Sequence, residues 1–74
     1  MTSRDVITRL KQAGWYEVAR DGSHHQFKHH EIPGRVTVPA PKKDIPYETL
    51  KSISKQSGVK FIWNWKVVWI RKLL

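Results

Sequence analysis

Turn-forming residues recur along the first 58 residues and divide this part of the chain into short segments. The turns are Gly14, Asp21-Gly22-Ser23, Pro33-Gly34 and Gly58. Glycine adopts backbone angles that other residues avoid, and Pro-Gly is a strong turn signal. The chain must therefore fold from short helices and strands, and the pattern between the turns indicates which.

Helical spacing of apolar residues marks the first and the last of these segments. In residues 3–13 the apolar side chains fall on one stripe, Thr2 or Ser3 can cap the first turn, and a glycine follows. Pro46 suits the first turn of a second helix, whose stripe includes Leu50. Both helices are expected to contribute side chains to the core.

Three segments between the helices are predicted to be strands. Residues 15–20, 24–30 and 35–38 contain aromatic or β-branched residues and are bounded by turns. Gly22 and Ser23 are expected to shape a tight turn, which makes the first two strands a hairpin. Two helices on one face of a three-stranded antiparallel sheet is the economical packing of this order. It is an α+β fold with the topology of double-stranded RNA-binding domains.

Strand alternation separates the histidines of the second strand. Successive side chains point to opposite faces of a sheet, so His25 and His29 share a face with Phe27 if that ring points into the core. The opposite face then carries His24, Gln26, Lys28 and His30. We therefore predict that His24 faces solvent.

The charge balance indicates an anionic partner. The chain has 14 Lys and Arg against 6 Asp and Glu, a net charge of +8, and residues 59–74 contain basic residues but no acid. This charge favours nucleic acid or an anionic membrane surface as the partner. No apolar run reaches the ~20 residues of a membrane span, and the start is too polar for a secretory signal, so a cytoplasmic protein is expected.

The histidines offer acid–base chemistry or metal binding. Histidine takes and gives a proton near neutral pH, so one at the edge of a turn on a basic domain suggests chemistry on a polyanion. The alternative is that His24 and His25 are ordinary surface residues. Imidazole also suits zinc, but alternation sends adjacent histidines to opposite faces and the chain has no cysteine. We expect no metal site and no cofactor.

Several linked segments resemble a known family. They occur in one order, follow an opening helix and Gly14-Trp15, and comprise Gly22-Ser23-His24-His25-Gln26-Phe27-Lys28-His29, Pro33-Gly34-Arg35-Val36-Thr37-Val38-Pro39, Pro41-Lys42-Lys43-Asp44-Ile45-Pro46, Thr49-Leu50-Lys51-Ser52-Ile53 and Lys55-Gln56-Ser57-Gly58. Residues 1–60 are similar, through these segments, to the HicA toxins.

The resemblance implies a toxin of a type II toxin–antitoxin system that cleaves mRNA as a metal-independent endoribonuclease. It implies one catalytic histidine directly after Gly-Ser, which is His24 here, and a HicB-type antitoxin that covers it. His30 or water is a candidate for the second proton transfer. The alternative is a double-stranded RNA-binding module without turnover. Candidate phosphate-binding residues in either case are Lys28, Arg35, Lys42 and Lys43.

Residues 61–74 form a basic aromatic extension beyond the HicA-like domain of residues 1–60. Their apolar residues fit both a strand and a helix, so periodicity does not decide between the two. We expect this extension to pack on the domain or to form a homo-oligomeric contact, because so much aromatic surface is unfavourable in water. A membrane-active tail is the third alternative.

Overall fold

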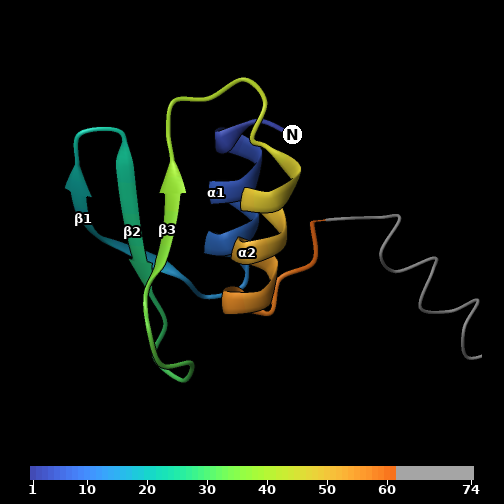
Figure 1. Cartoon of the computed structure of the whole chain (residues 1–74). Helices are drawn as coiled ribbons and strands as arrows, with labels where there is room; N and C mark the ends of the chain where they lie inside the picture. Colours follow the sequence, from blue (N-terminus) through green and yellow to red (C-terminus); the bar gives the residue numbers. More distant parts are fainter. Residues whose placement is uncertain (62–74) are drawn as a thin grey trace, which may run out of the picture.

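The computed structural model describes residues 1–61, and it contains two helices and one sheet (Figure 1). In chain order these elements are α1 (Ser3–Gln12), β1 (Tyr16–Asp21), β2 (His24–Lys28), β3 (Val36–Pro39) and α2 (Tyr47–Ser57). The α+β fold predicted from the sequence is confirmed, including the order of its elements.

The strands form an antiparallel sheet in the order β1-β2-β3, and the two helices lie side by side next to β3 (Figure 1). The core lies between the helices and the half of the sheet nearest to them. Its fully buried side chains are Val6, Leu10, Phe27, Val36, Val38 and Ile53. The β1–β2 hairpin therefore extends beyond the helices, and β1 is an exposed edge strand.

The start and end of α1 follow the expected capping chemistry. The Thr2 hydroxyl accepts a hydrogen bond from the backbone N–H of Asp5 at 3.1 Å. Gly14 ends the reversal after the helix with a φ of +97°, a conformation that favours glycine. A Cβ atom on Gly14 would also lie 2.7 Å from Nε2 of His29, so a larger residue would displace that ring. The glycine thus allows the end of α1 to contact the chain that follows β2.

The second strand is shorter than predicted. It was expected to run to His30, but β2 ends at Lys28. The next residue, His29, turns toward the end of α1: its Nε2 lies 2.9 Å from the Ala13 carbonyl oxygen, and its Nδ1 accepts the Glu31 N–H at 3.0 Å. These side-chain bonds replace strand pairing, which explains the early end of β2.

A β-bulge interrupts the pairing of β1 with β2. Glu17 pairs with Phe27, whereas Ala19 pairs with Gln26, so Val18 is an extra residue in β1. Beyond the bulge each side chain of β1 points to the face opposite to the one that simple alternation predicts. The first strand therefore has a changed parity, while β2 keeps a regular one.

The last described residue belongs to the core. Phe61 is buried, and its backbone N–H donates to the hydroxyl of Ser54 at 3.2 Å. The remaining residues of the predicted extension, 62–74, lie outside the described part of the chain, and so do the predictions made for them. Among residues 1–61 no helix has the length and apolar character needed to span a bilayer.

Candidate functional site

One face of the sheet is turned away from the helices, and we call it the open face. It comprises the strand residues whose position in the pairing register puts them on the side opposite to the buried Phe27. These are Tyr16, Ala19, Asp21, His24, Gln26, Lys28, Thr37 and Pro39. Arg35 extends it, because its guanidinium donates to the Gln26 side-chain oxygen at 2.6 Å. The predicted site residues of the strands, His24, Lys28 and Arg35, therefore lie on this face or beside it.

His24 is the first residue of β2 and lies on the open face at the tip of the hairpin. Its neighbours across the strands are Asp21 on one side and Pro39 on the other. The side chain is exposed, and within residues 1–61 it forms no hydrogen bond or ion pair. The prediction that His24 faces solvent is confirmed, and both ring nitrogens are available to a substrate.

The turn before His24 is built as its residues predict. Gly22 has a φ of +58°, which glycine adopts without strain. The Ser23 carbonyl oxygen accepts the Ala40 N–H at 2.7 Å, so the turn is tied to the end of β3. This bond brings the loop after β3 to the His24 end of the sheet.

Two of the four predicted phosphate-binding residues lie at one end of the open face, and the other two lie in the loop beyond its opposite end. Lys42 and Lys43 are exposed in the loop that leaves β3 at the His24 end. Lys28 ends β2 at the far end, and Arg35 immediately precedes β3. The backbone of Lys42 is fixed by Ser3, whose N–H donates to its carbonyl oxygen at 2.9 Å. A polyanion that crosses the face would meet positive charge at both ends.

His25 has a different environment from His24. Its Nδ1 lies 2.8 Å from a carboxylate oxygen of Glu17, and its side chain is only 14% exposed. Arg20 bonds the other carboxylate oxygen at 2.9 Å. This hydrogen bond lowers the pKa of Glu17, and the positive charges of Arg20 and His25 lower it further.

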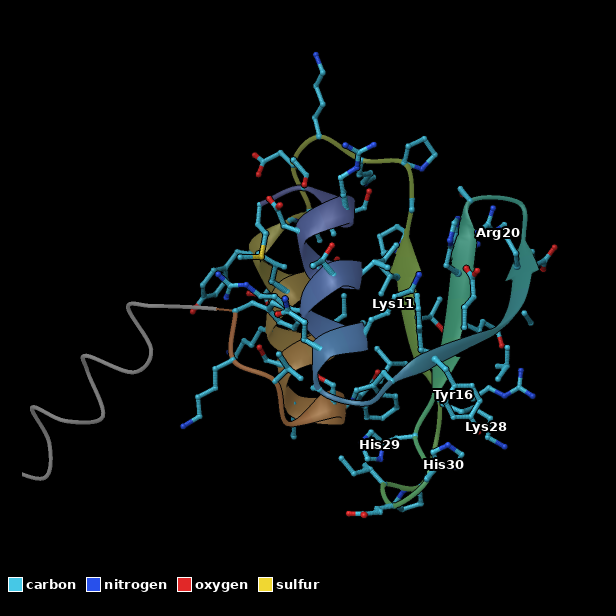
Figure 2. All side chains as sticks on the ribbon, turned by 180° about the vertical axis from the view of Figure 1, so that it is seen from behind. Lys11, Tyr16, Arg20, Lys28, His29 and His30 are labelled. Carbon is cyan, nitrogen blue, oxygen red and sulfur yellow. The ribbon has the colours of Figure 1, made fainter. Side chains whose placement is uncertain are left out.

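The other two histidines lie at the far end of β2 (Figure 2). His29 makes the bonds described above and packs against Trp15, with ring centroids 5.2 Å apart. His30 packs against Tyr16 in a tilted arrangement, with centroids 5.0 Å apart. Tyr16 pairs with Lys28, which lies four residues and about 13 Å along β2 from His24, so His30 lies at the end of β2 opposite to His24. That distance is too long for one phosphate, so the structure argues against His30 as the second proton-transfer group.

Sequence reasoning missed Tyr16, which was treated only as part of a strand. Its side chain is 41% exposed and lies beside Lys28 on the open face. The signal was present in principle, since Trp15 and Tyr16 are adjacent in a strand and only one of them can be buried. Within residues 1–61 no three His, Cys, Asp or Glu side chains converge in a way that could hold a metal ion.

Comparisons with known proteins agree with the fold. A solved structure described as a HicA3 and HicB3 toxin–antitoxin complex contains a similar chain, with 30% identity and a TM-score of 0.73. The match covers 84% of this chain and 100% of that chain. Comparison with curated proteins gave no match. A family model described as the HicA toxin of bacterial toxin–antitoxin systems matches residues 3–59. This chain belongs to the HicA toxin family.

Proposed function

We propose that this toxin is an endoribonuclease that cleaves mRNA, with His24 as its catalytic residue. One observation carries the proposal: in a HicA-family chain, the histidine after Gly22-Ser23 is exposed on a basic sheet face and has no partner within residues 1–61. A histidine with a purely structural role would be expected to have a bonding partner, as His25 and His29 do. An mRNA-cleaving toxin acts in the cytoplasm.

RNA contains its own nucleophile, the 2′-hydroxyl next to the phosphodiester. His24 takes the proton from this hydroxyl, and the oxygen attacks the adjacent phosphorus in line. The bond from phosphorus to the 5′ oxygen then breaks. A proton from water completes the leaving 5′-hydroxyl, and a 2′,3′-cyclic phosphate remains. This route needs one histidine and no metal ion.

Basic residues support this step by binding the phosphates. Lys42 and Lys43 are at the His24 end, where they are suited to the negative charge that develops on the attacked phosphate. Lys28 and Arg35 are suited to phosphates farther along the strand. Much of the affinity would then be electrostatic and would fall as salt rises.

A HicB-type antitoxin is the proposed protein partner. The similar chain of known structure is part of a complex described as HicA3 with HicB3. The open face is the surface that such an inhibitor would need to cover, because it contains His24 and the basic residues that attract RNA. An acidic partner would meet this face with complementary charge.

The test is incubation of the full chain with an mRNA in the presence of EDTA. We expect cleavage products that end in a 2′,3′-cyclic phosphate and begin with a 5′-hydroxyl, and no such products from the His24→Ala variant. RNA that is bound but not cut would instead favour the alternative, a non-catalytic RNA-binding module of the same fold. Cleavage that EDTA abolishes would contradict the metal-independent mechanism.

A further inference from the structure

We propose that Tyr16 and His30 form a stacking site for one unpaired nucleobase, with Lys28 binding a phosphate beside it. The proposal rests on the RNA-cleaving function proposed above and adds a second point of contact to it. This contact lies at the end of the open face opposite to His24. It assigns single-stranded RNA as the substrate class.

The first observation is a pair of exposed rings. A single exposed tyrosine on a protein surface needs no explanation. Here, however, the ring of His30 lies against it, with centroids 5.0 Å apart and planes 35° apart. Both residues are exposed on the protein surface, where a third ring can approach them. Bases of single-stranded RNA stack on aromatic side chains, histidine included.

The second observation is the cation beside these rings. Lys28 is the pairing partner of Tyr16, and the two side chains therefore lie next to each other on the open face. Figure 2 shows Tyr16, Lys28 and His30 together at the end of the hairpin that lies away from its tip. Aromatic rings next to a positive charge are the usual elements of single-strand binding, because they bind the base and the backbone separately.

The spacing along β2 relates this site to the cleavage site. His24 and Lys28 are on the same face of one strand, four residues and about 13 Å apart. The Arg35–Gln26 hydrogen bond lies between them. An RNA strand that binds at both ends of the open face therefore has its stacked base at a different nucleotide from the one that is cleaved.

The geometry also indicates why the base must be unpaired. In a double helix the faces of each base are covered by its neighbours, and proteins recognise the grooves and phosphates instead. The Tyr16–His30 pair offers two aromatic rings, which suit the face of a base and not such a groove. A single strand can present one base to it and still leave a flexible phosphodiester at His24.

The experiment measures the binding of a short single-stranded RNA to the full chain carrying His24→Ala, so that the RNA stays intact. Adding Tyr16→Leu should weaken binding roughly ten- to hundredfold, whereas Tyr16→Phe should not. Tyr47→Leu, which removes an exposed tyrosine from α2, is the matched control and should have no effect. A duplex of the same sequence should bind equally well to the chains with and without Tyr16→Leu.

Abasic nucleotides introduced one at a time then locate the contact. At one position the missing base should weaken binding as much as Tyr16→Leu does, and the two changes together should cost no more than either alone. The stacking site is wrong if the losses of affinity from the missing base and from Tyr16→Leu multiply at every position. It is also wrong if Tyr16→Leu weakens duplex binding as much as single-strand binding. If Tyr16→Leu lowers the melting temperature, the same binding measurements are made with His30→Ala in its place. Failure of the proposed function would differ, because the wild-type chain would then not cleave RNA in EDTA.

Discussion

His24 and His25 are adjacent in sequence, yet the fold gives them opposite environments. His24 is exposed on the open face without a partner in the described chain, whereas His25 is partly buried, with Nδ1 2.8 Å from a Glu17 carboxylate oxygen. The second arrangement, a carboxylate beside Nδ1 of an imidazole, resembles the one that often orients a catalytic histidine. Here it is on the face away from Lys28 and the other side chains suited to RNA. A nearby carboxylate by itself would therefore favour His25, whereas the exposed, basic surroundings favour His24.

The largest expected effect is that of His24→Ala on RNA cleavage. If His24 transfers a proton in the transition state, its loss should slow cleavage by about 10²–10⁴-fold. The side chain leaves no cavity, so the free energy of unfolding should change by less than about 0.5 kcal/mol. Cleavage rate and melting temperature are measured together. A folded His24→Ala protein with a normal cleavage rate would show that His24 is not the catalytic residue.

Association with the antitoxin tests whether the open face is the surface that the antitoxin covers. Lys28→Glu should slow association with an acidic HicB-type antitoxin by roughly tenfold at low salt, because it reverses a charge on that face. Lys51→Glu reverses an exposed charge on α2 and should change the rate little. Association rates of both variants over a salt series provide the measurement. Equal rates for the two variants would mean that the antitoxin binds elsewhere.

His25→Ala should have a smaller and different effect. It removes the 2.8 Å contact between Nδ1 and the Glu17 carboxylate together with the packing of a partly buried ring, and should therefore lower the free energy of unfolding more than His24→Ala does. Cleavage should stay within a few-fold of the wild-type rate. Denaturant unfolding and the cleavage assay are run beside those of His24→Ala. A stable but inactive His25→Ala protein would transfer the catalytic role to this second histidine.

The smallest effect is the acid sensitivity of the Glu17 cluster. The hydrogen bond from Arg20 lowers the pKa of Glu17 from its ordinary value of 4.5, so the folded state favours the charged carboxylate. The stabilisation is therefore complete above pH 4.5 and is lost as the pH falls through the lower, folded-state pKa. Glu17→Gln should be less stable than wild type at neutral pH, and the difference should shrink in acid. Melting temperatures from pH 7 down to pH 3 test this, and a constant difference would contradict it.

The sequence predicted the side of the sheet for His24 but not the partners of its neighbour. Alternation from the buried Phe27 gave the correct answer because β2 pairs regularly from His24 to Lys28. The Glu17–Arg20–His25 cluster depends on the bulge at Val18, which changes the face of Arg20. A bulge depends on the pairing and packing of two strands, so the sequence of one strand contains no clear signal for it.

The far end of the site was harder to predict for a related reason. The sequence predicts His30 in the second strand, on the same face as His24. In the structure β2 ends at Lys28, and His30 lies beyond the strand, next to the Tyr16 ring. The end of the strand is set by contacts of His29 with Ala13, a residue of the first helix boundary far away in sequence. Composition and turn signals do not report such tertiary contacts. Helix ends, which depend on local capping residues such as Thr2 and Gly14, were predicted well.

The bulge in β1 also limits how the length of this hairpin can change during evolution. Val18 is exposed and pairs with no residue of β2, so its side chain should accept many replacements. Loss of the residue itself is another matter. Deletion would restore one-to-one pairing and turn either Tyr16 and Glu17 or Arg20 and Asp21 onto the wrong face of the sheet. Homologous toxins that keep both the Tyr16 surface and the Glu17 cluster should therefore vary at this position by substitution and not by insertion or deletion.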